Sequence, residues 1–145
     1  MFKHILLPTD GSSLSEQAIQ QSVSLARALG AKITGLYVIP EYHTVTLQAE
    51  MLTDTSEDFT KFGLTQARKF LDVIEQEAKA AGVPFTAAHA TSDHPYEAII
   101  QAANDHGCDL ITMASHGRKG IQGLLIGSET QKVLVHSTIP VLVYR

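Results

Sequence analysis

Hydrophobic and polar positions divide the chain into short apolar runs that alternate with longer amphipathic stretches. The apolar runs are rich in β-branched residues, and we predict them as strands at residues 2–7, 32–39, 84–90, 109–114 and 139–144. Most of these runs are continuously apolar, which is typical of strands whose two faces are both buried. The pattern therefore predicts a parallel sheet that helices cover on both sides.

The amphipathic stretches predict four helices between these strands. The first is expected to open at Ser13, because Glu16 follows at the spacing of a capping box, and to close at Gly30. Apolar side chains at helical spacing predict the other three over about residues 67–82, 96–107 and 128–136. The alternation of strands and helices indicates right-handed crossovers within one α/β domain over residues 1–145.

Composition narrows the class of protein. Apolar residues make up 44% of the chain and charged residues 18%, which excludes wholesale disorder. The net charge is −4 and lysines and arginines occur only in small groups, so nucleic acid is not an expected partner. No apolar run suits a signal peptide or a membrane-spanning helix, and the single cysteine fits a reducing compartment. We therefore expect a cytoplasmic protein with no membrane partner.

Two polar stretches are not simple connections between these elements. Residues 40–58 are rich in Thr and Glu and are longer than most loops, which is typical of lids, binding loops or disordered segments. Residues 116–127 contain four glycines. Ligands of an open α/β sheet bind beyond the carboxyl ends of its strands, so residues 8–13 and 114–128 are the candidate binding segments.

The second candidate segment has the chemistry of an anion site. Its glycines allow backbone N–H groups to approach a phosphate, and Gly127 and Ser128 stand where the last helix begins. Arg118 and Lys119 add positive charge nearby. The segment matches neither the GxGxxG of dinucleotide-binding turns nor the GxxxxGK[ST] of phosphate-binding loops.

Four residues of this segment, Ala114, Gly117, Gly127 and Ser128, resemble the ATP-binding signature of the universal stress protein family. That signature reads Gly, two residues, Gly, nine residues, Gly, then Ser or Thr. The chain departs from it at the first position, which is Ala114. The similarity extends to residues 7–12, 37–39 and 139–143, and so covers essentially the whole chain.

The resemblance implies a five-stranded parallel sheet in the order 3-2-1-4-5, a homodimer and a stress-related role in the cytoplasm. It implies a site for ATP with Mg²⁺ or Mn²⁺, with AMP as another occupant. Asp10 would contact the adenosine, the backbone of Val38 would read the adenine edge, and Ala114 would lie beside the ribose. The phosphates would bind at the glycine-rich segment. Apart from the resemblance, we expect residues 40–58 to form a flap over the adenine side. The implied site residues are Pro8, Asp10, Val38, Ala114, His116, Gly117, Gly127 and Ser128.

Simpler interpretations stand beside these roles. Asp10 could instead stabilise a turn or cap the first helix, and the glycines could make only a flexible loop. Ser115 and His116 are not expected to form a catalytic pair, because neighbours on an extended chain point to opposite faces. The seven histidines show no metal-ligand spacing. Cys108 is expected to be a small buried residue, with a redox role as the alternative.

The favoured hypothesis is an ATP-binding sensor or regulator that is not a fast enzyme, because no residue is placed as a general base. The alternative is a dimeric interaction module whose site is empty or holds AMP. The departure from the signature at Ala114 supports this alternative. A third hypothesis, by fold analogy alone, is a hydrolase acting on the α-phosphate. We expect the homodimer to form through residues 139–144, because an exposed apolar edge strand promotes aggregation unless it is covered. A side chain at Gly127 is expected to strain the turn and fill the phosphate site.

Overall fold

The computed structural model describes residues 1–43, 56–116 and 126–145 of the chain. Five strands and four helices alternate along these residues, as the sequence pattern predicts. The elements are β1 (His4–Pro8), α1 (Ser13–Leu29), β2 (Lys32–Ile39), α2 (Ser56–Ala81), β3 (Phe85–Thr91), α3 (Pro95–Asp105), β4 (Leu110–Ala114), α4 (Ser128–His136) and β5 (Val141–Tyr144).

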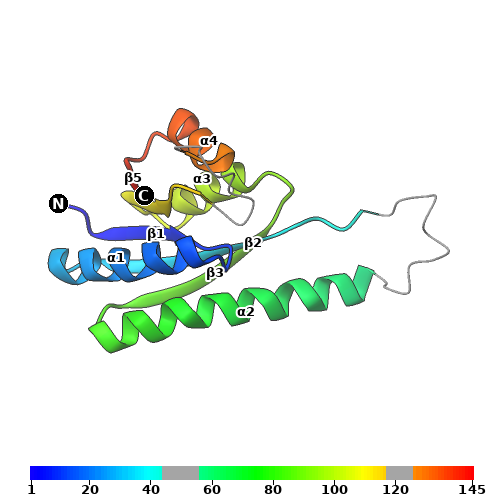
Figure 1. Cartoon of the computed structure of the whole chain (residues 1–145), viewed down its shortest axis with the longest axis horizontal. Coiled ribbons are helices and arrows are strands. Elements are labelled where there is room, and N and C mark those ends of the chain that lie inside the picture. Colours follow the sequence, from blue (N-terminus) through cyan, green and yellow to red (C-terminus); the bar gives the residue numbers. More distant parts are fainter. Residues whose placement is uncertain (44–55, 117–125) are drawn as a thin grey trace.

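The strands form one parallel sheet in the order β3-β2-β1-β4-β5, which confirms the expected fold. β1 lies at the centre, where Ile5 is in register with Ile33 of β2 and with Leu110 of β4. Helices α1 and α2 cover one face of the sheet, and α3 and α4 cover the other (Figure 1). The chain winds outward from β1 through β2 to β3 and then crosses to β4 and β5. The carboxyl ends of β1 and β4 therefore flank the point where the strand order reverses.

The core explains why the strand sequences are continuously apolar. Ile5, Leu6 and Leu7 of β1 are each 0% exposed. Successive side chains of a strand point to opposite faces, so Ile5 and Leu7 pack with α1 and α2, whereas Leu6 packs with α3. Both faces of β1 are thus apolar because each face packs against a layer of helices.

Helix α1 begins at Ser13, as predicted, but the residue that caps it differs from the expected capping box. Ser12, not Ser13, is the N-cap, and its Oγ accepts a hydrogen bond from Ser15 N at 3.2 Å. The turn after β1 leaves Ser12 with extended backbone angles (φ −74°, ψ 162°), which an N-cap residue requires. The expected capping box is therefore not formed, and Glu16 instead adds an acidic group to the first turn.

The start of α2 also corrects the sequence interpretation. The helix begins at Ser56, so the last three residues of the long polar stretch 40–58 belong to it. Glu57 and Asp58 lie in its first turn, where acidic side chains favour a helix start. The flap predicted over residues 40–58 lies mostly outside the described residues.

Cys108 precedes β4 and is 6% exposed. Burial raises the pKa of its thiol to about 11, which fits the small buried residue that the sequence predicts. Within residues 1–43, 56–116 and 126–145, every helix is too short or too polar to cross a membrane.

Candidate functional site

A cavity of about 340 Å³ opens at the carboxyl ends of β1, β2 and β4, where the strand order reverses. The turn after β1, the end of β2, the end of β4 and the first turns of α3 and α4 form its wall. The described residues that line it are Pro8, Thr9, Asp10, Ser15, Tyr37, Val38, Pro40, Pro95, Ile99, Met113, Ala114, His116, Glu129 and Thr130.

Five of the eight site residues predicted from the sequence line this cavity: Pro8, Asp10, Val38, Ala114 and His116. Gly127 and Ser128 stand at the start of α4, directly before two lining residues of that helix. Gly117 lies outside the described residues, together with the neighbouring basic residues 118 and 119. The topology therefore brings together the two segments that the sequence analysis singled out.

Asp10 has a structural contact as well as a place in the cavity wall. Its Oδ1 accepts a hydrogen bond from Ser12 N at 2.9 Å, across the turn that leads into α1. Thr9 supports the same turn, because its Oγ1 lies 2.7 Å from Ser15 Oγ and accepts a hydrogen bond from Gly11 N at 3.2 Å. The turn thus holds the Asp10 carboxylate at the carboxyl end of β1.

Gly11 allows this turn to pack against α2. Its φ is +82°, and a Cβ atom placed there would lie 2.4 Å from Cε1 of Phe70. Phe70 in turn stacks on Tyr37, whose ring centroid is 5.6 Å away and which lines the cavity. Only a residue without a side chain satisfies both the backbone and the close approach.

The end of β4 contributes Ala114 to the wall. Ala114 is the last residue of the strand, and its carbonyl accepts a hydrogen bond from Thr130 Oγ1 at 3.0 Å. Every non-glycine residue that the structure describes has a negative φ. The backbone at Ala114 therefore tolerates an alanine where the signature has glycine.

Ser115 and His116 correct a prediction. Their side chains were expected to point to opposite faces, but Ser115 Oγ lies 3.1 Å from His116 Nδ1. The strand has ended at Ala114, so the alternation of side chains no longer applies. Ser115 is only 4% exposed, and His116 Nε2 is buried without a hydrogen-bond partner among the described residues.

Gly127 is the N-cap residue of α4, and its conformation differs from expectation. Its φ of −69° and ψ of 158° are extended angles that any residue adopts, so the strain predicted for a side chain there is absent. Its N–H donates to Ser115 O at 2.6 Å, so this amide is already engaged. Gly127 supplies no side-chain cap, which leaves the amides of Ser128, Glu129 and Thr130 without an acceptor inside the helix.

Glu129 is a cavity residue that the sequence analysis missed. Its Oε2 accepts a hydrogen bond from Tyr96 N at 2.9 Å, and so it caps the start of α3 from the neighbouring helix. Its Oε1 lies 3.4 Å from Lys132 Nζ. No local pattern connects residues 96 and 129, since only the packing of α3 against α4 brings them together.

A second cluster of titratable groups lies next to the cavity rim. Glu41, His43 and Asp93 are exposed, and one metal-ligating atom of each lies within 4.8 Å of the others. His43 Nε2 pairs with Asp93 Oδ2, and this hydrogen bond raises the pKa of His43 and lowers that of Asp93. Spacing along the sequence could not reveal this group, because Asp93 is far from the other two residues in the chain.

The profile of the universal stress protein family matches residues 1–145. The chain belongs to this family.

Individual relatives agree over the full length. A universal stress protein of Thermus aquaticus, from the QAH/OAS sulfhydrylase 3′ region, is 32% identical over 149 residues, covering 100% of both chains. The solved structure of protein MJ0577 has a TM-score of 0.82 and 27% identity, covering 99% of this chain and 95% of that one. By sequence, universal stress protein MJ0577 of Methanocaldococcus jannaschii is 30% identical, with 100% of this chain and 96% of that protein covered.

Two solved structures with the same fold carry adenine nucleotides. One is a universal stress protein in complex with cAMP, with a TM-score of 0.65 and 22% identity, covering 99% of this chain and 97% of that one. The other is the universal stress protein from Archaeoglobus fulgidus in complex with dAMP, with a TM-score of 0.62 and 15% identity, covering 100% and 98%.

Proposed function

We propose that this universal stress protein binds ATP with Mg²⁺ or Mn²⁺ in the cavity, and acts as a nucleotide-dependent regulator of a cytoplasmic stress response. One observation carries the proposal. The cavity at the reversal of strand order reaches the first turn of α4, which begins at a glycine and has no side-chain cap. Amides without acceptors at a helix start, together with the helix dipole, favour a phosphate.

The described residues fit a nucleotide in two ways. The amides of Ser128, Glu129 and Thr130 are donors without an intrahelical acceptor, and His116 Nε2 is a buried polar atom that lacks a described partner. Tyr37 and Val38 give the wall by β2 the apolar surface that suits a base. In this proposal Asp10 holds the ribose side, and the divalent ion neutralises phosphate oxygens.

The known relatives support the class of ligand. Universal stress proteins with this fold have been solved with cAMP and with dAMP, which are both adenine nucleotides. The choice of a triphosphate rests on the spacing of Ala114, Gly117, Gly127 and Ser128. The proposal thus combines a ligand class taken from relatives with a phosphate segment taken from the sequence.

We do not assign a rapid hydrolytic activity to the site. Ser115 is 4% exposed, so its hydroxyl is not accessible to a substrate in the cavity. The Nδ1 atom of His116 pairs with that hydroxyl. A nucleophile needs access as well as an adjacent base, so the pair suits a structural role at the end of β4.

The proposal includes a homodimer formed through β5. This strand ends the sheet, and among its residues Leu142 is 38% exposed. Val135 of α4 is 70% exposed and Leu134 of the same helix is 40% exposed, so α4 also presents apolar side chains. Pairing of two copies through this edge would satisfy the free strand in a closed, two-fold arrangement.

The charges of the cavity favour a second candidate, a dimeric interaction module whose site is empty or holds AMP. The described part of the wall contains the carboxylates of Asp10 and Glu129 and contains no lysine or arginine. A monophosphate brings less negative charge to such a wall than a triphosphate does. ATP binding would therefore depend more strongly on the divalent ion than AMP binding.

Calorimetric titration of ATP and AMP, with and without Mg²⁺, tests the two candidates. We expect ATP to bind only with the metal ion. Gly127→Ser should lower ATP affinity about tenfold or more, because a serine N-cap would take the amides that bind phosphate, while the helix gains stability. Gly82→Ala, after α2, is the control: its backbone φ is +71° with nothing within 4 Å, so it should leave affinity unchanged.

Mass spectrometry of small molecules released from the denatured protein provides an independent test. Released ATP supports the first candidate. Released AMP, or affinity for AMP with none for ATP and Mg²⁺, would favour the interaction module instead. Unchanged ATP affinity in Gly127→Ser would refute the placement of the phosphates at α4.

A further inference from the structure

A second cavity lies between β3 and α3. Its volume is about 390 Å³, and no residue in its wall belongs to the first cavity. Ala88, His89 and Ala90 of β3 form one side, and Glu97, Gln101 and Asp105 of α3 are on the other. We call this the β3–α3 groove.

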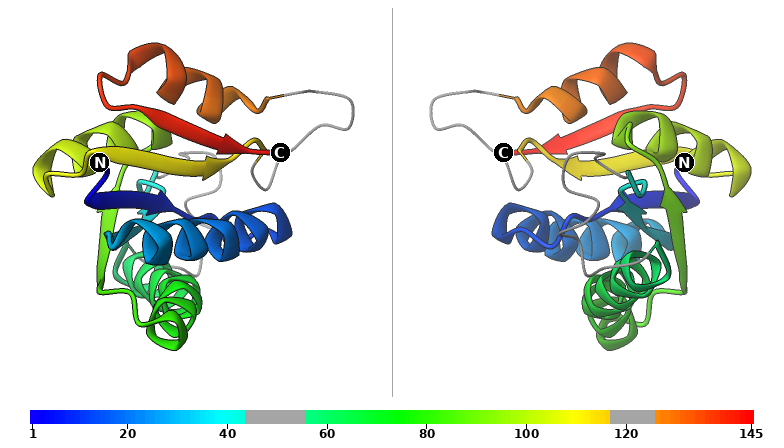
Figure 2. Two further views of the ribbon diagram at one scale, coloured as in Figure 1. Left: turned by 90° about the vertical axis from the view of Figure 1, so that its left-hand side faces the viewer. Right: turned by 90° about the vertical axis from the view of Figure 1, so that its right-hand side faces the viewer.

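The groove borders a free edge of the sheet. β3 is the terminal strand opposite β5, and within the described residues it pairs only with β2 (Figure 2). An edge strand normally carries lysine, proline or a bulge that prevents another strand from pairing with it. β3 is seven residues long and contains neither lysine nor proline. Its central segment is Ala-Ala-His-Ala. Ala87, His89 and Thr91 of this strand are exposed.

The acidic side chains that line the groove both come from α3. Glu97 and Asp105 lie eight residues apart on α3, with Gln101 midway between them. Tyr96 Oη donates to Glu97 Oε1 at 3.0 Å, and Gln101 Nε2 donates to Asp105 Oδ1 at 2.7 Å. These donors are neutral, and no lysine or arginine lines the groove among the described residues. Histidines 89 and 106 are the basic side chains that line it.

We propose that the β3–α3 groove binds an extended, basic segment of a partner protein, which adds to the sheet beside β3. Main-chain hydrogen bonds to the strand edge would give affinity, and side-chain charges would give specificity. Because the two carboxylates face the groove from one helix, they select lysine or arginine on the side of the segment that faces α3. A β5-mediated dimer leaves this edge free, so the two interactions are compatible.

The geometry also predicts the spacing of the basic residues. Eight residues of a helix span about 12 Å, and four residues of an extended strand span about 13 Å. Side chains four apart on a strand point to the same side, whereas side chains three apart point to opposite sides. A segment with basic residues at i and i+4 therefore matches Glu97 and Asp105, and one with i and i+3 does not.

Two fluorescein-labelled peptides of identical composition test this proposal: Thr-Lys-Val-Thr-Val-Lys-Thr and Thr-Lys-Val-Val-Lys-Thr-Thr. Binding to the full chain is followed by fluorescence anisotropy at low salt. We expect the first peptide, with lysines four apart, to bind about fivefold more tightly than the second, because the second can form one ion pair at a time. Hydrogen exchange should slow at alternate amides of β3 when the first peptide is bound.

Charge-neutral variants test the contacts. Glu97→Gln and Asp105→Asn should each remove the preference for the first peptide, whereas Glu75→Gln, an exposed position on α2, should keep it. Circular dichroism checks that each variant is folded. Equal affinity for the two peptides, an unchanged preference in both variants, or no binding would overturn the proposal. So would self-association of this chain in light scattering that a lysine substitution in β3 abolishes. The outcome is independent of nucleotide titrations, which report on the other cavity.

Discussion

Gly11 is the residue at which a single methyl group should disturb both stability and the candidate site. Its backbone has a φ of +82°, and an added Cβ would lie 2.4 Å from Cε1, 2.5 Å from Cζ and 2.7 Å from Cδ1 of Phe70. Gly11→Ala therefore combines a left-handed backbone with a clash against an aromatic ring. The ring stacks on Tyr37 and so cannot move away without disturbing the cavity wall.

Two terms set the size of the effect. A left-handed conformation costs a residue with a side chain about 1–2 kcal/mol relative to glycine. Forcing an extra methyl group into a packed region costs about 1–3 kcal/mol more. We therefore expect Gly11→Ala to lower the free energy of unfolding by about 2–5 kcal/mol, which is a large part of the roughly 5–15 kcal/mol typical of a domain.

Gly30 provides the matched control. It caps α1 with a φ of +68°, but nothing lies within 4 Å of the Cβ position. Gly30→Ala should show the backbone term alone, about 1–2 kcal/mol. The double variant Gly11→Ala with Phe70→Leu should recover part of the packing term, because leucine lacks the ring atoms that clash.

Urea denaturation of the four proteins, followed by circular dichroism, measures these differences, and ATP titration measures the effect on the site. Affinity for the nucleotide should fall in Gly11→Ala and stay unchanged in Gly30→Ala, because only Gly11 adjoins Asp10. If the two glycine variants lose equal stability, or if Phe70→Leu recovers nothing, the Phe70 contact does not constrain the turn.

Four further predictions concern other parts of the molecule. In calorimetry, Ala114→Gly should raise ATP affinity by no more than about tenfold, and Ala114→Val should lower it. If Ala114→Gly binds ATP and the native protein does not, the methyl group of Ala114 closes the site. The thiol of Cys108, with its pKa raised to about 11 by burial, should react with an aromatic disulfide reagent at mildly alkaline pH only after unfolding. Asp93→Asn should lower the pKa of His43 in an NMR titration. The stabilisation from this pair is present below the ordinary pKa of His43 and is lost as pH rises through its raised value, and an identical titration in the variant would disprove the pairing. Leu142→Lys should convert the proposed dimer to a monomer in light scattering, and a dimer that survives this change does not use β5.

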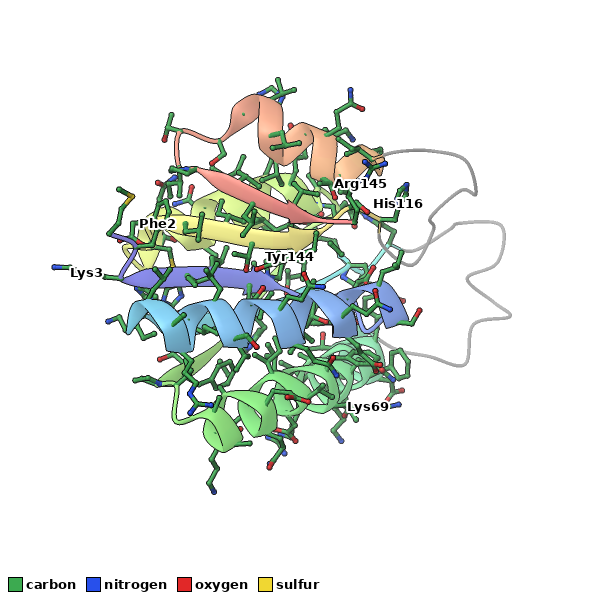
Figure 3. The ribbon with its side chains drawn as sticks, turned by 60° about the vertical axis from the view of Figure 1, so that its left-hand side comes forward. Phe2, Lys3, Lys69, His116, Tyr144 and Arg145 are labelled. Atoms are coloured by element: carbon green, nitrogen blue, oxygen red, sulfur yellow. The ribbon has the colours of Figure 1, made fainter. Side chains whose placement is uncertain are left out.

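The proposed partner groove and the proposed nucleotide cavity share no lining residue, although α3 contributes to both. His116 lies at the same end of the sheet as Arg145, the residue that follows β5, as Figure 3 shows. Ser115, next to His116, accepts a hydrogen bond at its carbonyl from Gly127 N and donates from its own N–H to Tyr144 O. The start of α4 and the end of β5 are therefore joined through one residue, whereas the β3–α3 groove lies across the sheet.

The class of fold was predictable because it depends on burial at individual positions. Strands with two covered faces are mostly apolar on both faces, as Ile5, Leu6 and Leu7 of β1 are, whatever their exact neighbours. The helix ends at Gly30 and Gly82 were also predictable, because the backbone there has a positive φ, which glycine adopts readily. The expected strand order and the expected nucleotide-binding residues came from resemblance to a family, because local patterns do not encode which strands pair.

The remaining features needed the tertiary structure. The contact of Phe70 with Gly11 joins α2 to the turn after β1, and Glu129 caps a helix that begins at Pro95. Ser115 and His116 pair because β4 ends at Ala114, as predicted, so the alternation of strand side chains does not extend to these two residues. Such contacts depend on how helices cross the sheet and where each element stops. Hydrophobic periodicity determines which face of an element is buried, but leaves open which residue of another element meets it.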